Sequence, residues 1–210
     1  MAKRNKRGLM GCSNIPYAQR LKLQQQQDIV DCRNHAARIA MYCTTIALHD
    51  VAGIGYTRIY RFSQHFRQLL NEFYEDPDVG MSHATKRMAE LGMEIEGEYF
   101  QIDRQPDETA RDAELRQNAG QAIQAALIVG AIAANDVFGF GPERQKRLAT
   151  RIGELSKRYN QEGPGKGQKF LLEEMEKIGF PIVDGKAMVY TDQDGAAVTP
   201  AAVRRSYDEL

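Results

Sequence analysis

The feature that most constrains the fold of this chain is an internal repeat. Residues 50–61 and 136–147 are identical at six of twelve positions, at a constant offset of 86 residues. The shared positions comprise an aspartate, a valine, a Gly-x-Gly pair and two arginines. Unrelated segments share about one residue in twelve, so the match predicts two diverged copies of one structural unit.

The similarity continues on both sides of these segments. Downstream, after one inserted residue, residues 88–95 align with residues 175–182. Upstream, four small or apolar residues of the first copy recur unchanged in the second: Ala36, Ala40, Ile46 and Ala47. The duplicated unit therefore spans most of the 210-residue chain, and the two copies are expected to superpose about an approximate two-fold axis.

Each copy is predicted to contain three helices, which makes the fold class all-α. The first helix is Ala-rich, so it can approach another helix closely and is expected at the buried centre. The second has apolar residues at i, i+3, i+4 and i+7, and the third ends at a glycine that is typical of a helix C-terminus. The predicted ranges are 34–50, 56–74 and 81–91 in the first copy and 114–136, 142–160 and 167–178 in the second. The first helix is open to a backward extension from Pro16.

The repeat and the local composition divide the chain into five parts. The N-terminal residues are basic and look disordered, and the last residues are expected to form a small β-hairpin around a turn at 192–195 and then a short helix. The predicted parts are a basic arm at 1–15, a first helical unit at 16–103, a linker at 104–113, a second helical unit at 114–182 and a C-terminal hairpin and helix at 183–210.

Charge and cysteine usage limit the class of protein. The chain has 28 Lys plus Arg and 28 Asp plus Glu, so it is neither a strongly basic nucleic-acid binder nor an acidic nucleic-acid mimic as a whole, although a local patch is compatible with zero net charge. Three cysteines without a C-x-x-C pair favour a reducing cytoplasm. The longest apolar stretch, 122–134, is too short to span a bilayer, and no signal-type apolar run follows the N-terminus, so a soluble protein is expected.

The Gly-x-Gly corners are the most specific candidate site. Such a corner between two helices resembles the helix-hairpin-helix corner of DNA-binding proteins, in which backbone N–H groups and nearby basic side chains hold a phosphate. The alternative is a sharp turn between packed helices, with Ile54 or Phe140 filling the core. The residues of the candidate binding site are Gly53, Gly55, Arg58 and Arg61 in the first copy and Gly139, Gly141, Arg144 and Arg147 in the second.

Charged residues near these corners raise two further questions. Asp50 and Asp136 end the first helix of each copy, where the helix dipole disfavours an acid, so each is expected to pair with a nearby arginine such as Arg58 or Arg61 of the same unit. The N-terminal basic arm is either a nucleic-acid contact or a solvated terminus. Its basic residues are Lys3, Arg4, Lys6 and Arg7.

The residue patterns do not indicate an enzyme. Cys32 and His35, with His49 and His65, supply too weak a ligand pattern for a metal site, and the second copy contains neither cysteine nor histidine. Neither a Ser-His-Asp order nor a G-x-S-x-G elbow occurs. We therefore expect a binding protein without catalytic residues, metal or cofactor.

The segment 133–148, with its Phe-Gly-Phe-Gly sequence followed by a proline, an acid and an arginine, resembles a motif of small helical phage and prophage proteins of Gram-positive bacteria. The first copy departs from it with Ala-Gly-Ile-Gly at 52–55. Some small phage proteins with such segments look like inhibitors of bacterial defence, including anti-CRISPR proteins. The resemblance implies a cytoplasmic protein of the bacterial host cell that inhibits a defence nuclease by protein contact. The alternative is a DNA-binding accessory protein that uses the paired corners and the basic arm.

Overall fold

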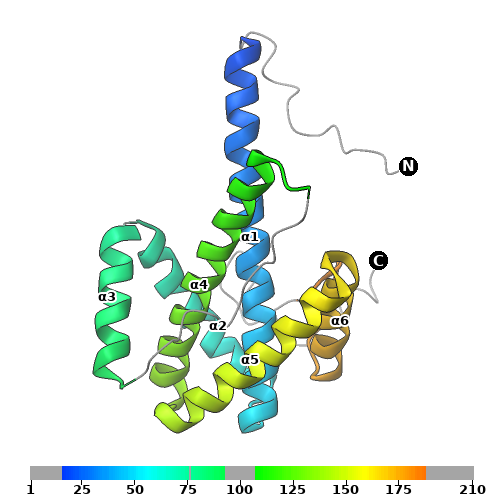
Figure 1. Cartoon of the computed structure of the whole chain (residues 1–210). Helices are drawn as coiled ribbons and strands as arrows, with labels where there is room; N and C mark the ends of the chain where they lie inside the picture. The colour runs from blue at the N-terminus through cyan, green and yellow to red at the C-terminus, as the bar shows by residue number, and fades with distance from the viewer. Residues whose placement is uncertain (1–15, 76, 93–106, 188–210) are drawn as a thin grey trace, which may run out of the picture.

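The computed structural model describes residues 16–75, 77–92 and 107–187. Helices account for 85% of it, so the predicted all-α class is confirmed. The elements follow one another as α1 (Tyr17–Ala52), α2 (Tyr56–Glu75), α3 (Pro77–Glu90), α4 (Ala110–Phe138), α5 (Pro142–Glu162), α6 (Pro164–Lys177), β1 (Ile182–Val183) and β2 (Lys186–Ala187). Figure 1 shows how they are arranged.

Several element boundaries differ from the predicted ones. Thr109 and Asp112 form a reciprocal capping box that starts α4 at Ala110, so the predicted linker at 104–113 is too long. The two strands pair antiparallel across Asp184 and Gly185, earlier than the predicted turn at 192–195, which lies outside the described residues together with the basic arm and the C-terminal helix. The backward extension of the first helix is confirmed, because α1 begins at Tyr17.

The two Ala-rich helices lie at the centre of the molecule, as predicted. α1 and α4 pack along each other and run in the same direction, so both end at the same side of the protein (Figure 1). Ala40, Ala47, Ala126 and Ala133 are fully buried between the helices. Small side chains allow close approach of the two backbones, and larger ones at these positions would force the helices apart.

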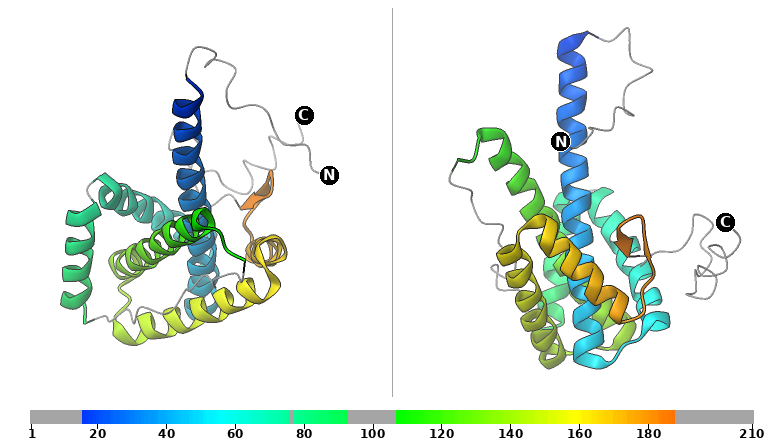
Figure 2. Two further views of the ribbon diagram at one scale, coloured as in Figure 1. Left: turned by 45° about the horizontal axis from the view of Figure 1, so that its top comes forward. Right: turned by 90° about the vertical axis from the view of Figure 1, so that its right-hand side faces the viewer.

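The remaining helices cross from one copy to the other. α2 and α3 pack on α4, whereas α5 and α6 pack on α1. Neither α2 nor α5 makes extensive contact with the central helix that precedes it in the chain. The sequence divides the chain into two consecutive units, but the packing exchanges their outer helices, and the two views of Figure 2 show both pairs of outer helices flanking the α1–α4 core.

α4 is long and apolar enough to cross a membrane by length and composition, with a mean hydropathy of 1.4 in its most apolar window. The apolar stretch at 122–134 is therefore part of a longer apolar helix than the sequence suggested. Of that window, 61% is buried inside the protein. Its composition is thus accounted for by packing against α1, α2 and α3.

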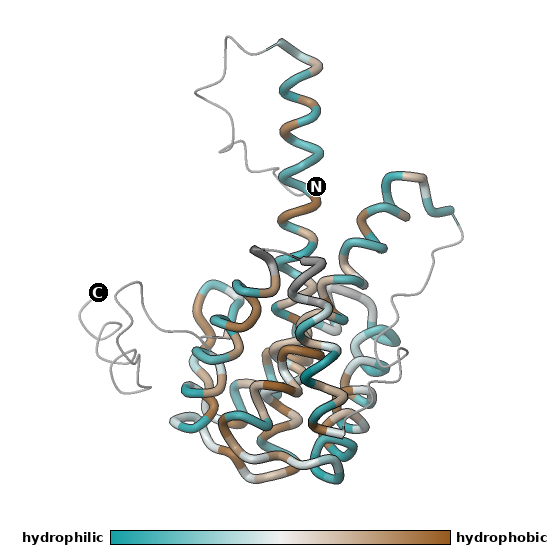
Figure 3. The backbone as a smooth tube through the Cα atoms, turned by 90° about the vertical axis from the view of Figure 1, so that its left-hand side faces the viewer, coloured by the Kyte–Doolittle hydropathy of each residue, from teal (hydrophilic) through white to brown (hydrophobic). Residues whose placement is uncertain are grey.

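The N-terminal part of α1 projects beyond the other helices (Figure 1). Four large apolar side chains on this part are between 43% and 74% exposed: Tyr17, Leu21, Leu23 and Val30. Polar residues separate them, among them the run 24–28, and the projecting helix is accordingly mixed in hydropathy along its length (Figure 3). This part of α1 therefore carries exposed apolar side chains outside the packed helices.

Candidate functional site

The first glycine of each corner is required by the backbone. Gly53 and Gly139 cap α1 and α4 with φ of 61° and 65°, the left-handed conformation that non-glycine residues adopt at a cost. Their N–H groups donate to the carbonyl oxygens of His49 and Asn135, each at 2.7 Å. These acceptors are themselves equivalent at the offset of 86 residues, so both copies end their central helix in the same way.

The second glycine of each corner is different. Neither Gly55 nor Gly141 has a positive φ, and a Cβ atom added to either would meet nothing within 4 Å. Gly141 is the N-cap of α5 in an extended conformation, and no side chain caps the helix there. The fold itself therefore does not require glycine at these two positions.

The residue between the two glycines fills the core. Ile54 and Phe140 are both buried, and the ring of Phe140 lies 5.8 Å from the ring of Phe138, measured between centroids. The interpretation of the corners as sharp turns with an apolar plug is thus confirmed for these two side chains. It does not exclude a second role for the exposed groups around them.

The two corner aspartates are paired across the repeat, and the expected pairing with Arg58 or Arg61 is wrong. A carboxylate oxygen of Asp50 lies 2.8 Å from the Nε atom of Arg151. Asp136 lies 2.8 Å from His65 Nε2 and 2.6 Å from an amino group of Arg87. The reason is the exchange of helices, because α5 lies against α1 and brings Arg151 to Asp50, whereas α2 and α3 lie against α4 and bring His65 and Arg87 to Asp136.

This pairing leaves the arginines of the candidate site without an acidic partner. Arg58, Arg61, Arg144 and Arg147 are exposed and form no ion pair with any residue in the described ranges. The guanidinium carbon of Arg144 lies 5.6 Å from the centroid of the Phe140 ring, within the range of a cation–π contact. The positive charge at this end is therefore available to an external group.

A cleft of about 360 Å³ lies between the two corners. It is lined by three pairs of residues that are equivalent at the offset of 86: Ala52 with Phe138, Ile54 with Phe140, and Arg58 with Arg144. Arg61 and Val137 complete the lining. The floor is thus apolar, and among the described residues the charged groups of the lining are all arginines.

The structure therefore brings most of the predicted site residues together. Three of the four arginines line the cleft, and each of the four glycines is next in sequence to a lining residue, whereas Arg147 is exposed on α5 outside the lining. The sequence did not indicate that Val137 and Phe138 line a cleft, because apolar residues at the end of an apolar helix are ordinary core positions. It also missed the partners of the aspartates, although His65 and Arg151 occupy equivalent positions and the repeat alignment could have indicated them.

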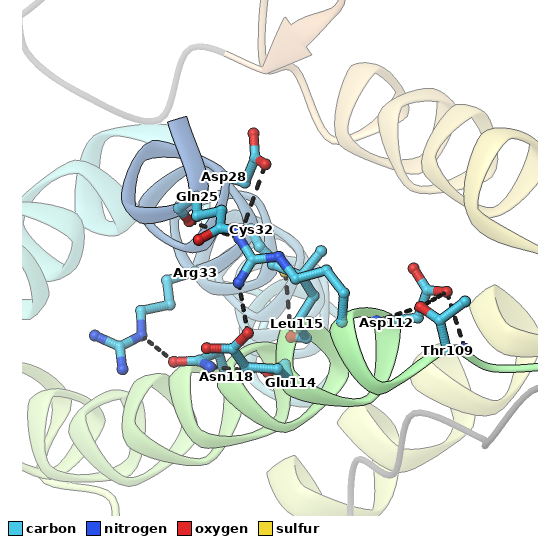
Figure 4. A network of polar contacts seen from close by, with 10 residues as sticks. Gln25, Asp28, Cys32, Arg33, Thr109, Asp112, Glu114, Leu115 and Asn118 are labelled. Carbon is cyan, nitrogen blue, oxygen red and sulfur yellow. Dashed lines mark hydrogen bonds and ion pairs between the residues drawn. The ribbon is translucent and has the colours of Figure 1, made fainter. Parts of the chain in front are cut away.

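The opposite end of the α1–α4 pair has a different electrostatic character. There the guanidinium group of Arg111 lies 2.5 Å from Glu114 and 3.8 Å from Asp28, and it donates to the carbonyl oxygen of Gln25 at 2.6 Å (Figure 4). Arg33 donates to Asn118 at 2.9 Å in the same network. Arg111 is thus paired with two acids within the protein, in contrast to the arginines of the corner end.

The two cysteines of the described residues, Cys32 and Cys43, are not suited to nucleophilic chemistry. Burial raises the pKa of the Cys43 thiol to about 12. Burial also raises the pKa of Cys32, which hydrogen-bonds to the carbonyl oxygen of Leu115 in the network of Figure 4. Both thiols are therefore protonated at neutral pH and are poor nucleophiles.

Comparison of the chain with protein-family models, with curated proteins and with solved structures gave no match.

Proposed function

We propose that the protein is a non-enzymatic binding protein that holds the phosphate backbone of a nucleic acid against the end where the two glycine corners meet. One observation carries the proposal. Arg58 and Arg61 from one copy and Arg144 from the other converge on a single cleft without an acidic partner among the described residues.

Arginine is suited to this role because its planar guanidinium group binds two phosphate oxygens at once and remains charged at all physiological pH values. A single exposed arginine is ordinary on a protein surface. Here three converge from two helices that lie far apart in the sequence, while the nearby aspartates are neutralised by other cations. A local positive field of this kind attracts a polyanion even when the net charge of the chain is zero.

The proposal is tested by the salt dependence of DNA binding. We expect the parent protein to bind a duplex of about 20 base pairs, with an affinity that falls steeply as salt rises. Arg58→Gln combined with Arg144→Gln should lower the affinity and reduce the salt slope by about two, because each lost phosphate contact removes about one released counterion. Thermal melting should change only slightly, because both side chains are exposed and only the cation–π contact of Arg144 with Phe140 is lost.

The matched control is Arg20→Gln combined with Arg67→Gln. These arginines are also exposed, but they lie on α1 and α2 and do not line the cleft. The control removes the same charge and should leave the salt slope as it is in the parent. Equal slopes in the cleft variant and the parent, or no binding to DNA at low salt, would contradict the proposal.

A protein partner is the second candidate, and the projecting part of α1 favours it. Leu23 and Val30 lie seven residues apart on one face of this helix and are both nearly half exposed. Exposed apolar residues at this spacing are typical of a helix that lies in a groove of a partner. This candidate includes the inhibition of a bacterial defence nuclease that the phage resemblance implies.

Co-purification from a bacterial lysate tests the second candidate. The parent chain should retain a partner that Leu23→Ser combined with Val30→Ser does not retain, and a purified nuclease partner should be inhibited at about one inhibitor per target. Inhibition far below that ratio would indicate catalysis instead. Retention of the same proteins by both chains would remove the reason to assign a partner to this helix.

A further inference from the structure

We infer that the nucleic acid bound at the corner end is a duplex, held so that each glycine corner faces one strand. In this arrangement Gly55 and Gly141 are the points where the phosphate backbone approaches the protein backbone. The inference rests on the proposed function and adds to it the form of the nucleic acid and its orientation.

The first step is the symmetry of the packing. Exchanging α1 with α4, α2 with α5 and α3 with α6 converts each main helix–helix contact into another one that is also present: α1–α5 into α4–α2, α1–α6 into α4–α3, and α5–α6 into α2–α3. The contact of Asp50 with Arg151 is converted in the same way into that of Asp136 with His65, and both measure 2.8 Å. The described helices are therefore related by an approximate two-fold axis.

The second step places the cleft on this axis. α1 and α4 run in the same direction, so the axis lies along them and leaves the protein where both corners are (Figure 1). The cleft is lined by equivalent residues of both copies, among them Arg58 and Arg144. A site with two equivalent cations across a two-fold axis fits a ligand with two equivalent anionic groups.

Duplex DNA is such a ligand, because its antiparallel strands are related by local two-fold axes and a single strand has none. Arg58 and Arg144 are equivalent across this axis, so in the proposed complex each contacts a phosphate of one strand. The apolar floor, with Ile54 and Phe140, then faces the groove between them.

The third step concerns the second glycine of each corner. Gly55 and Gly141 are not required by φ or by internal packing, yet both copies carry glycine there. A glycine without an internal role is suited to the close approach of an external group, because a side chain would stand between that group and the backbone N–H. Gly55 and Gly141 directly follow the lining residues Ile54 and Phe140, so in the proposed complex each glycine faces one strand.

The first experiment compares strands. Fluorescence anisotropy should show that a 20-base-pair duplex binds at least about tenfold more tightly than either of its single strands at the same salt concentration. Hydroxyl-radical footprinting should show protection on both strands, symmetric about one point. Equal affinity for duplex and single strand, or protection of one strand only, would overturn the inference while leaving the proposed function intact. If neither form binds, the proposed function itself fails.

The second experiment tests the glycines with Gly55→Ala, Gly141→Ala and the double variant. Each single variant should weaken duplex binding several-fold and to a similar extent, and the two effects should multiply in the double variant. Gly165→Ala is the control, because this exposed glycine of α6 also has open space for a Cβ and lies outside the cleft. Circular dichroism at the assay temperature verifies that every variant is folded. Parent-like binding by both single variants, or an effect at only one corner, would overturn the inference.

Discussion

The two glycine corners share one backbone geometry but are held by different side chains. In the first corner His49 Nδ1 lies 3.3 Å from the carbonyl oxygen of Ile54, and in the second the amide of the equivalent Asn135 donates to the carbonyl oxygen of Phe140 at 3.0 Å. The second corner has an additional polar contact through Gln145, whose equivalent in the first copy is the apolar Ile59. A duplicated turn can therefore keep its shape while its supporting contacts diverge.

The aspartates show the same divergence. Asp50 is held by Arg151, and the hydrogen bonds that Arg151 donates to Glu154 and Asp50 raise the pKa of this arginine. Asp136 is held by His65 at the equivalent position and by Arg87, which has no counterpart in the contacts of Asp50. The requirement shared by both corners is a positive partner from the other copy, and the identity of that partner is not fixed.

The largest expected effect comes from the shared centre. Ala126→Leu should destabilise the protein by about 1–3 kcal/mol, because the added methyl groups have no space between α1 and α4. The equivalent change, Ala40→Leu, should cost a similar amount if the two-fold relation holds for the core. Urea unfolding curves measure both values. Parent-like stability of either variant would mean that this part of the interface is not closely packed.

The second corner should depend more on polar contacts than the first. Gln145 is buried and donates to the carbonyl oxygens of Ala131 at 2.9 Å and Phe140 at 3.4 Å. Gln145→Ile makes this position identical to the first copy and removes both donors. We expect a loss of about 1–2 kcal/mol in urea unfolding, because a buried carbonyl is left with fewer partners. An unchanged midpoint would show that the two corners do not differ in this respect.

The first glycine of each corner should behave alike in both copies. Gly53→Ala and Gly139→Ala should each cost about 1 kcal/mol, because alanine is strained in the left-handed conformation. Thermal melting measures the effect, with Gly55→Ala as the matched comparison in which little loss is expected. Equal losses at Gly53 and Gly55 would remove the distinction between a structural and an unconstrained glycine.

The smallest effect is expected for the aspartate pairs. A double-mutant cycle with Asp50→Asn and Arg151→Gln should give a coupling energy below about 1 kcal/mol, because both side chains are about one-third exposed and water screens the pair. The same cycle with Asp136→Asn and Arg87→Gln should be similar or slightly larger, because the Asp136 side chain is only 17% exposed. A coupling much larger for Asp50 than for Asp136 would reverse this order.

Much of the fold could be predicted from the sequence because its signals are local. Each signal depends only on neighbouring residues: the Ala-rich runs, the i, i+3, i+4 spacing of α2 and the glycine at each helix end. Because the chain is repeated, the same pattern of elements is predicted independently in both copies. The capping box at Thr109 was also visible in the sequence, but its acid is an aspartate and not the usual glutamate or glutamine. The predicted linker at 104–113 therefore includes the first turn of α4.

The exchange of helices could not be predicted, because a short corner lets the next helix pack either on its predecessor or on another helix. For this reason the partners of the aspartates were assigned to the wrong unit. His65 and Asp136 are 71 residues apart, and Asp50 and Arg151 are 101 apart. Neither pairing leaves a signal in the local sequence, and only the comparison of the two copies shows that His65 and Arg151 are equivalent.

The exchange of outer helices also has a consequence for how the molecule comes together. If the chain were cut between α3 and α4, each fragment would keep a central helix whose covering helices belong to the other fragment. The two copies in the intact protein are therefore arranged like the two subunits of an intertwined dimer that have been joined into one chain. Its core depends on contacts between residues far apart in sequence, so it has a high contact order for a helical protein and should fold more slowly than a bundle of sequential neighbours. During synthesis, the first half emerges without the surfaces that complete it, and the native core forms only after the second half has followed.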